Sequence, residues 1–266
     1  MREGHASLTA RRVAAHRLSF PRLASPYGRP EADQQLQADV AAGVDVEPTP
    51  IARYLRARTG FFDRVVVGAL DAGIRQVVVV GAGYDGRSLR YARPGVRWFE
   101  LDHADTQADK RARLDRLGIG AAEIGFAATD FVVDDAADAL GRVGHDPERA
   151  SLFACEGVAA YLPIDALARL LRALRRRAAP ASTLAITLAL RSDSPTDAAP
   201  QALRAAVAGM GEPLLSELPR GELAAFLLGG GWTVHRATDP AGLDLAGSER
   251  TSAFVLAAPA EEGEGR

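Results

Sequence analysis

Short apolar runs alternate with amphipathic segments along most of the chain. The residues from Val77 to Val80 form an unbroken β-branched run, which is typical of a strand buried on both faces of a parallel sheet. Comparable runs predict strands at 76–80, 97–101, 123–127, 151–155, 184–188, 233–236 and 253–256. The strongest helical pattern covers 165–178, where leucines at 167, 170, 171 and 174 form one apolar stripe.

Strands that alternate with helices predict a doubly wound α/β fold, with a mostly parallel seven-stranded sheet and helices on both faces. Two regions interrupt this alternation. Residues 1–72 are helical or irregular and precede the first strand, whereas 191–222 form an insertion rich in Pro, Ala and Ser. We expect one domain, with a helical lid over 1–72, a core over 73–190, a cap at 191–222, the last strands at 223–258 and a flexible tail at 259–266.

Composition favours a single enzyme domain. The 266 residues are 47% hydrophobic, so they can bury a large core. The formal net charge of −2 gives no reason to expect a nucleic acid or an anionic membrane as partner. Because no window reaches the roughly 18–20 apolar residues of a membrane helix, no membrane span is expected. The arginine-rich N-terminus lacks the apolar block of a secretory signal, which predicts a first structural helix and a cytoplasmic protein.

Three residue types limit the possible chemistry. Lys110 is the only lysine among 32 basic residues, a bias that we attribute to codon usage in a GC-rich bacterial genome. Cys155 is the only cysteine, which excludes an internal disulfide, and its apolar neighbours predict a small buried hydrophobe. The histidines at positions 5, 16, 103, 145 and 235 have no ligand spacing, so no metal site is expected.

The clearest motif is the glycine turn after the first predicted strand. Gly81, Gly83 and Gly86 match the pattern G-x-G-x-x-G, and the segment "VRWFELD" places acids about twenty residues later. Glycine allows a tight turn and a close approach of ligand to backbone, and the helical segment expected from Arg87 would point its free N–H groups at that ligand. The pattern suits NAD(P), but S-adenosylmethionine has a ribose with the same needs, so the turn alone does not decide between them.

Six motifs in one order narrow the choice. They are "SLTARRVAAHR" near the start, "RTGFFD" at 58–63, "VVVGAGYDGR" at 78–87, "WFELD" at 98–102, "ATDF" at 128–131 and "CEGVAAYLP" at 155–163. Together they resemble the leucine carboxyl methyltransferase-like family of S-adenosylmethionine-dependent O-methyltransferases, which has many bacterial members in polyketide and other secondary metabolism. The resemblance runs from about residue 6 to 190 and returns in "TSAFVLAAP". It implies a Rossmann-like class I methyltransferase fold.

The resemblance also implies roles for individual residues in binding S-adenosyl-L-methionine, whose product is S-adenosyl-L-homocysteine. Arg58 would pair with the methionine carboxylate, Asp102 would accept both ribose hydroxyls, and Glu156 would hold the α-amino group. Asp130 would take the adenine amino group with Phe131 beside the base. The residues Gly81, Ala82 and Gly83 would pass under the ligand. Tyr161 and Arg191 are candidates for the pocket of the methyl acceptor.

Other roles for three of these residues stay open, and Glu156 is harder to reassign. Arg58 could pair only with Asp63, Glu100 could be the ribose acid in place of Asp102, and Asp130 could cap a helix. Glu156 follows the apolar run "SLFAC", where a carboxylate is costly without a cationic partner. A bound ammonium group would be such a partner.

The chain also departs from the family pattern. Gly86 stands where the family usually has threonine, and this glycine completes the literal dinucleotide motif. "HA" follows Asp102 where a proline is expected. Relatives that methylate protein C-termini carry a lysine near the position of Ala10. This loss weakens the case for a protein substrate, and either Arg11 or Arg17 could replace the lysine.

These observations predict an S-adenosylmethionine-dependent O-methyltransferase that acts on a small metabolite. No histidine and acid are placed convincingly as a general base, and His103 beside Asp102 is read as a neighbour of the ribose. A carboxylate acceptor, which is already ionised at neutral pH, needs no such base, so methyl ester formation is favoured and no catalytic residue is assigned. The alternatives are an NAD(P)-dependent oxidoreductase and a catalytically silent relative that binds a partner. We expect a monomer or homodimer.

Overall fold

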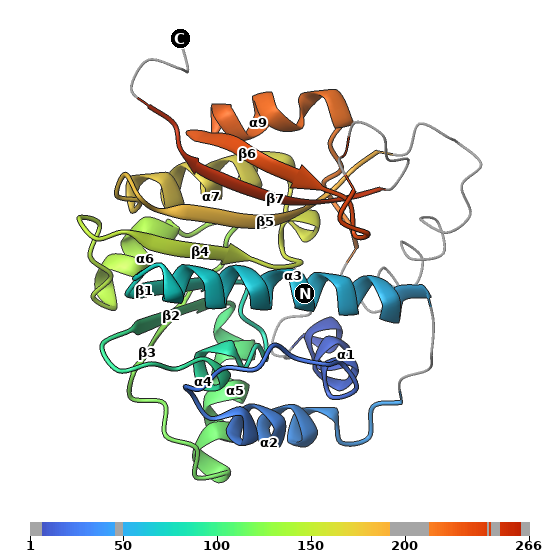
Figure 1. Cartoon of the computed structure of the whole chain (residues 1–266), viewed down its shortest axis with the longest axis vertical. Coiled ribbons are helices and arrows are strands. Elements are labelled where there is room, and N and C mark those ends of the chain that lie inside the picture. Colours follow the sequence, from blue (N-terminus) through green and yellow to red (C-terminus); the bar gives the residue numbers. More distant parts are fainter. Residues whose placement is uncertain (1–6, 46–49, 192–212, 244, 246–250, 262–266) are drawn as a thin grey trace.

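A seven-stranded sheet forms the centre of the computed structural model, which describes residues 7–45, 50–191, 213–243, 245 and 251–261 (Figure 1). The strands are β1 (Gln76–Val80), β2 (Arg97–Asp102), β3 (Ile124–Ala128), β4 (Ser151–Cys155), β5 (Thr183–Ala189), β6 (Trp232–Thr238) and β7 (Ser252–Pro259). Every predicted strand is present. β3 begins one residue later than predicted, and β5, β6 and β7 are longer at both ends.

The strand order is β3-β2-β1-β4-β5-β7-β6. β1 pairs in parallel with both β2 and β4, whereas β7 is antiparallel to β5 and β6. From β1 the chain therefore adds β2 and β3 on one side, and then returns to add β4 and β5 on the other side of β1. Ligands of doubly wound folds bind at such a reversal, outside the carboxyl ends of the strands. The predicted fold class is confirmed.

Helices cover both faces of the sheet. One face carries α1 (Leu8–Arg17), α2 (Pro30–Ala41), α3 (Pro50–Asp71), α4 (Arg87–Arg90) and α5 (Ala104–Arg116), and the other carries α6 (Ala136–Arg142), α7 (Ile164–Arg176) and α9 (Leu223–Gly229). Two 3₁₀ turns, η1 (Ala159–Tyr161) and η2 (Arg220–Glu222), complete the assigned elements of the described chain. Among the described helices, none has the length and apolarity needed to cross a membrane.

The apolar stripe of α7 packs as predicted. Leu167, Leu170, Leu171 and Leu174 are all buried against the sheet, because residues three and four apart share one side of a helix. The helix predicted from Arg87, in contrast, ends at Arg90 after a single turn. The backbone N–H of Arg87 donates to the Asp85 carboxylate at 2.8 Å, so this helix start does not offer that N–H to a ligand.

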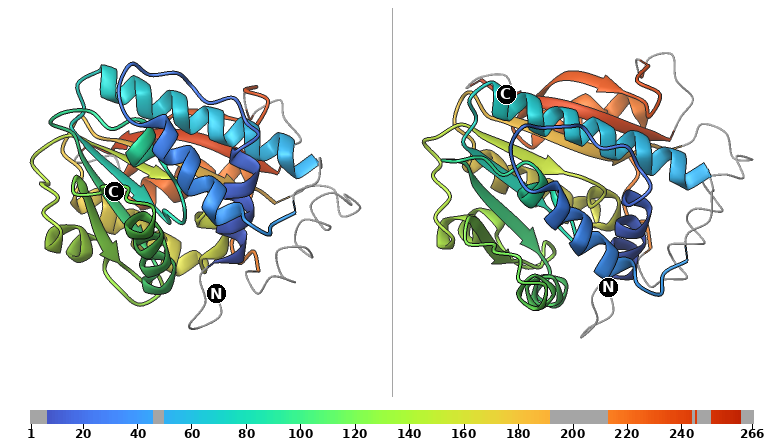
Figure 2. Two further views of the ribbon diagram at one scale, coloured as in Figure 1. Left: turned by 90° about the horizontal axis from the view of Figure 1, so that it is seen from below. Right: turned by 60° about the horizontal axis from the view of Figure 1, so that its bottom comes forward.

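The N-terminal region is helical, as expected, and α1, α2 and α3 all lie on one side of the sheet (Figure 2). α3 lies along β4, α1 packs beside α3, and α2 packs on α1 and α4 (Figure 1). Of the predicted cap at 191–222, residues 192–212 lie outside the described part of the chain, as do residues 262–266 of the predicted tail.

Candidate cofactor and acceptor site

The glycine turn between β1 and α4 is held by hydrogen bonds within the protein. Gly81 and Gly83 have φ values of +65° and +49°, a conformation that favours glycine. The N–H groups of Gly81 and Ala82 both donate to the carbonyl of Leu101, and that of Gly83 donates to Asp102. These three N–H groups are therefore engaged by the neighbouring β2 strand.

The space left by the missing side chains is filled by other parts of the chain. A Cβ on Gly81 would lie 2.7 Å from the Val158 Cβ, and a Cβ on Gly83 would lie 3.0 Å from that of Ala10. The turn thus fits against the loop after β4 on one side and against α1 on the other. Helix α1 lies directly on the motif that was predicted to bind the cofactor.

Gly86 serves a different purpose from the third glycine of a dinucleotide motif. Its φ is −102°, which other residues adopt readily, but a Cβ there would lie 1.8 Å from the Asp33 Oδ1. The glycine makes room for a carboxylate from α2. With Asp85 also beside the start of α4, two acids occupy the place where a pyrophosphate would bind, which counts against the dinucleotide alternative.

Asp102 ends β2 beside the turn. Its carboxylate accepts the N–H groups of Gly83 and of His103, the latter at 2.6 Å. Burial raises the pKa of Asp102 to about 6, although these two hydrogen bonds act in the opposite direction. Glu100, the alternative acid, is fully buried and bonds to Ser88 and Lys110 at 2.7 Å and 2.5 Å. Glu100 is thus engaged within the protein, and Asp102 is the more accessible acid.

The loop after β3 lies next to Asp102, because the Thr129 N–H donates to the Asp102 carbonyl at 2.8 Å. Asp130 Oδ1 accepts the Val132 N–H at 2.9 Å, so Asp130 caps the turn at 131–134, whereas Asp135 caps α6. Phe131 packs against the apolar cluster under α6 and α7 and lines a separate cavity of about 120 Å³. Its contact with adenine stays a prediction.

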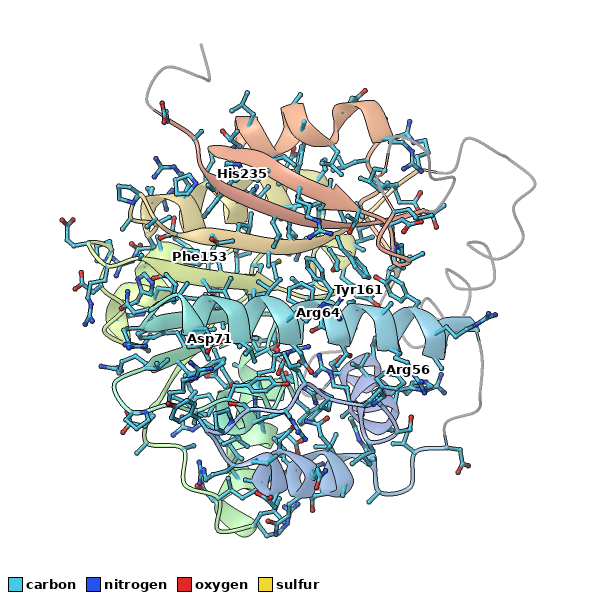
Figure 3. All side chains as sticks on the ribbon, viewed as in Figure 1. Arg56, Arg64, Asp71, Phe153, Tyr161 and His235 are labelled. Carbon is cyan, nitrogen blue, oxygen red and sulfur yellow. The ribbon has the colours of Figure 1, made fainter. Side chains whose placement is uncertain are left out.

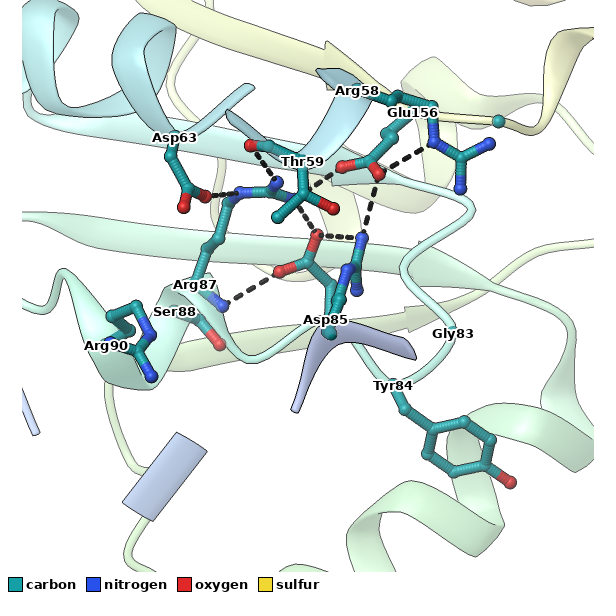
Figure 4. A network of polar contacts seen from close by, with 12 residues as sticks. Arg58, Thr59, Asp63, Gly83, Tyr84, Asp85, Arg87, Ser88, Arg90 and Glu156 are labelled. Carbon is teal, nitrogen blue, oxygen red and sulfur yellow. Dashed lines mark hydrogen bonds and ion pairs between the residues drawn. The ribbon is translucent and has the colours of Figure 1, made fainter. Parts of the chain in front are cut away.

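Glu156 follows β4 and is surrounded by arginines (Figure 4). Its carboxylate lies 2.9 Å from Arg58 Nε, 2.6 Å from an Arg87 Nη and 3.0 Å from an Arg17 Nη. Burial alone would raise the pKa of Glu156, but Arg17, Arg87 and Arg58 hold it well below its usual range. The argument that Glu156 needs an external ammonium group as its cationic partner is therefore wrong, since the chain supplies three cations.

Arg87 was not predicted as a site residue, although it joins most of this cluster. It contacts Asp63 at 2.7 Å as well as Asp85 and Glu156 (Figure 4). Asp63 also pairs with Arg22 at 2.7 Å, and no ion pair with Arg58 is formed. The alternative in which Arg58 pairs with Asp63 is wrong, and the "D-x-R" within the glycine motif was the available signal for Arg87.

Arg58 is held in place by groups on three sides. Its guanidinium lies against Gly157, where a Cβ would be only 2.6 Å from an Nη atom, and Gly157 has a φ of +69°. The Tyr54 ring faces the guanidinium carbon, with 5.4 Å from that carbon to the ring centroid. Burial alone would lower the pKa of Arg58, but Glu156 and the phenols of Tyr54 and Tyr161 raise it overall. Gly157 and Tyr54 were missed by sequence reasoning.

The two predicted acceptor residues differ in their surroundings. Tyr161 belongs to η1, and its phenol is one of the groups that raise the pKa of Arg58. Arg191 follows β5 with an exposed side chain, and its N–H donates to the Leu218 carbonyl at 2.9 Å. It adjoins residues 192–212, which the structure does not describe.

Arg11 and Arg17, the two candidate replacements for the family lysine, both belong to α1, but their side chains reach different parts of the protein. Arg11 points to the end of α2, where it donates to the carbonyls of Val40 and Ala42 at 3.4 Å and 3.3 Å. Arg17 reaches the Asp85 carboxylate as well as Glu156. Position 17 is seven residues from Ala10, which is two helical turns along the same side. Arg17 is therefore the arginine that extends from α1 into the site.

The remaining reactive residues lie away from this cluster. Cys155 is fully buried, which raises the pKa of its thiol to about 12, so the prediction of a small buried hydrophobe is confirmed. His145 bonds to Ser151 at the amino end of β4, and burial lowers its pKa to about 4. Within the residues that the structure describes, no cluster of His, Cys, Asp or Glu is arranged to hold a metal ion.

Comparison with known proteins decides between the cofactors. The family model for leucine carboxyl methyltransferase matches residues 12–175. The chain belongs to the leucine carboxyl methyltransferase family. A candidate S-adenosyl-L-methionine-dependent methyltransferase of Mycolicibacterium smegmatis is 35% identical over 213 residues, which cover 73% of this chain and 67% of the relative. Another, from Mycobacteroides abscessus, is 30% identical over 236 residues, covering 85% and 75%. This methyltransferase therefore uses S-adenosylmethionine.

Solved structures support the fold of the methyltransferase. A candidate methyltransferase from Thermobifida fusca and a DUF574 family protein from Streptomyces avermitilis both align with a TM-score of 0.61. The first is 17% identical and covers 97% of each chain, and the second is 15% identical and covers 96% of this chain and 98% of its own. Magnesium protoporphyrin IX methyltransferase from Synechocystis, solved with bound S-adenosylhomocysteine, aligns at 0.52 with 12% identity, covering 81% and 90%.

Proposed function

We propose that this methyltransferase transfers a methyl group to a carboxylate oxygen of a small metabolite in secondary metabolism and so forms a methyl ester. The observation that carries this choice is the placement of the histidines in the described chain. His145 and His235 lie away from the strand ends around Glu156, and His16 stacks on Phe20. His103 caps α5 by accepting the Asp105 N–H. A carboxylate acceptor needs no proton removed at neutral pH.

The side chains around the turn fit the polar groups of S-adenosylmethionine. Arg58 would bind the methionine carboxylate, and Glu156 would bind the ammonium group by exchanging part of its arginine contacts. Thr59 is buried beside both, and its hydroxyl has no hydrogen-bond partner among the described residues, which leaves it available to the same ligand. Asp102 would bind the ribose hydroxyls and Asp130 the adenine amino group.

Helices α1 to α3 would act as the lid over this crevice, with residues 73–190 as the core that they cover. α1 lies on Gly83 through Ala10 and reaches Glu156 through Arg17. It must shift for the cofactor to enter. Once closed, α1 would exclude water and hold the cofactor between the lid and the strand ends.

When bound, S-adenosylmethionine supplies an electrophilic methyl group on a sulfonium. The chain's own part is to position the acceptor, and such positioning contributes roughly 7–11 kcal/mol in favourable cases. Tyr161 beside Arg58 would line the acceptor end of the site, with Arg191 as a second contact at the outer rim.

The proposal can be tested with labelled S-adenosylmethionine and an extract of the producing organism. The labelled product should release methanol in mild alkali, as a methyl ester does, and the rate should be nearly flat from about pH 6.5 to 8.5. An alkali-stable product, or a rate that rises through a pKa near 7, would replace the carboxylate with a hydroxyl acceptor. Binding of S-adenosylhomocysteine without any transfer would favour a catalytically silent relative.

A further inference from the structure

A small cavity lies where the end of α1 meets α2 and α4, and the function proposed above does not use it. Its volume is about 30 Å³, enough for one or two groups of the size of water. The polar lining consists of three arginines, one acid and two amides, which are Arg17, Arg22, Arg90, Asp33, Gln34 and Gln37. Cationic groups therefore outnumber anionic ones around this space.

The same imbalance runs through the whole buried charge network. Nine charged side chains of the described chain, each at most 10% exposed, are linked by ion pairs. They are Arg17, Arg22, Arg58, Arg87, Arg90, Asp33, Asp63, Asp85 and Glu156. Five guanidinium groups and four carboxylates leave one positive charge in excess. A buried charge without a counterion is costly.

Cofactor binding does not remove this excess. The methionine part of S-adenosylmethionine carries an ammonium, a carboxylate and the sulfonium, so the cofactor adds one positive charge and supplies no counterion. The pair of Lys110 and Glu100 is neutral as well. His16 lies next to the network on α1, but burial and Arg12 lower its pKa, so its positively charged form is disfavoured. Neither the cofactor nor these neighbours supply a negative charge to the linked network.

One buried donor marks where that charge would bind. Arg17 is 7% exposed, and its Nε donates no hydrogen bond to any residue in the described part of the chain. Its Nη2 contacts Asp85 and Glu156, whereas Arg22 and Arg90 share Asp33 at 3.2 Å and 2.5 Å. Of the lining arginines, Arg22 and Arg90 thus share Asp33, and Arg17 pairs with acids outside the lining. Among the described residues, the Arg17 Nε–H and the Gln37 Oε1 have no hydrogen-bond partner.

We propose that this cavity binds a small inorganic monoanion such as chloride. The anion would accept the Arg17 Nε hydrogen bond and neutralise the excess charge shared by Arg22 and Arg90. In this way it would stabilise the packing of α1 and α2 on α4. Neither the cofactor nor the acceptor takes part, so the proposal stands or fails independently of the methyl transfer.

Thermal unfolding without cofactor tests the proposal directly. The melting temperature is measured at constant ionic strength while sodium chloride replaces sodium gluconate, whose anion is too large for the cavity. Constant ionic strength keeps general screening unchanged. At ten times the dissociation constant of chloride, the melting temperature should rise by about 3–6 °C. An equal melting temperature in both salts would overturn the proposal.

A pair of variants on α2 locates the effect. Gln34 is exposed and lines the cavity, and Gln34→Glu supplies a carboxylate from the chain itself. This variant should be more stable than the wild type in gluconate and should lose the response to chloride. Gln35→Glu changes the charge equally on an exposed neighbour that is not part of the lining, and it should keep the full response. A chloride response of equal size in the two variants would place the anion elsewhere.

Discussion

The two faces of the sheet are joined to their helices by different interactions. On the face of α6, α7 and α9, packing is apolar, and none of the buried polar or charged residues of the described chain belongs to these three helices. On the face of α1 to α4, nine buried charged side chains form one network around Glu156 and Asp63. Charged side chains are therefore absent from the buried contacts of α6, α7 and α9 in the described chain. They are concentrated in the buried contacts between the sheet and α1 to α4.

The two faces contribute differently to stability and to ligand binding. Apolar packing stabilises a fold without any ligand, whereas a buried ion pair often gives little net stability because both ions lose hydration. The charged face nevertheless lies at the carboxyl ends of β1 and β4, where this fold binds its ligands. We infer that the network maintains a polar interior, which the zwitterionic end of a cofactor can enter by exchanging partners.

The largest expected effect comes from breaking the network. Asp63→Ala leaves Arg22 and Arg87 without a shared carboxylate, and unpaired buried charges should cost about 3–5 kcal/mol in the free energy of unfolding. Urea denaturation measures this loss. Asp71→Ala is the control, since Asp71 is an exposed partner of Arg93, and it should cost less than about 1 kcal/mol. Similar losses in both variants would show that burial of the pair is unimportant.

Arg58→Ala should affect ligand binding next most strongly. Removing its guanidinium should weaken S-adenosylhomocysteine binding by roughly 2–4 kcal/mol, because a carboxylate of the ligand loses a charged partner. Isothermal titration calorimetry measures the affinity. Arg64→Ala removes an arginine from the exposed side of the same helix (Figure 3) and should bind normally. Unchanged affinity in a folded Arg58→Ala protein would remove Arg58 from the cofactor site.

Lowering the pH should remove roughly 2 kcal/mol from the contribution of Asp63, on the charged face, to the free energy of unfolding. Burial alone would raise the pKa of Asp63, but Arg87 and Arg22 lower it to about 2 from an ordinary value of 3.8. The folded pKa lies below the unfolded one, so this stabilisation is present above about pH 4 and is lost as the pH falls through 2. Unfolding free energies between pH 6 and 2 should show this loss in the wild type.

Leu171→Ala provides the counterpart from the apolar face. Leu171 is fully buried in α7, and its truncation should cost about 2–5 kcal/mol at every pH, leaving the acid slope unchanged. Asp63→Ala should have a shallower slope. Equal slopes in the two variants would contradict the division between the faces.

The smallest effect is expected from two glycines. Gly86→Ala brings a Cβ against Asp33 and should destabilise the protein by about 1–2 kcal/mol. Gly68→Ala adds the same atom within α3, where nothing lies within 4 Å, and should stabilise the protein by about 0.5–1 kcal/mol. Thermal unfolding of both variants gives the comparison, and a stabilised Gly86→Ala would show that Asp33 can move away easily.

The apolar face could be predicted from sequence because its pattern is local. The valines of β1 and the leucines of α7 repeat at the spacing of a strand and a helix, and that spacing determines which side they bury. The positions of Asp102 and Glu156 follow in the same way, since each comes directly after a predicted strand, and Asp130 follows the strand predicted at 123–127 within three residues. Parallel strands bring such residues to one edge of the sheet.

The charged face could not be predicted because its contacts are distant in sequence. Its central ion pairs join three separate segments that meet only in the folded chain, at Arg17, Arg87 and Glu156. A charge pattern does not say which acid an arginine will contact, so Arg58 was assigned to Asp63 as an alternative and Arg87 was not considered. Gly86 was likewise interpreted as the third glycine of a G-x-G-x-x-G motif. In the structure its role is to leave space for the carboxylate of Asp33, 53 positions earlier.

Hydrogen exchange with and without S-adenosylhomocysteine tests the central claim most directly, namely that the charged face is the binding face. At labelling times too short for global unfolding, the ligand should protect α1, α2, the first half of α3 and the turns after β1 and β4, because their local openings are suppressed. The helices α6, α7 and α9 should exchange as before. Protection concentrated in α6, α7 and α9, with α1 and the glycine turn unchanged, would contradict the account.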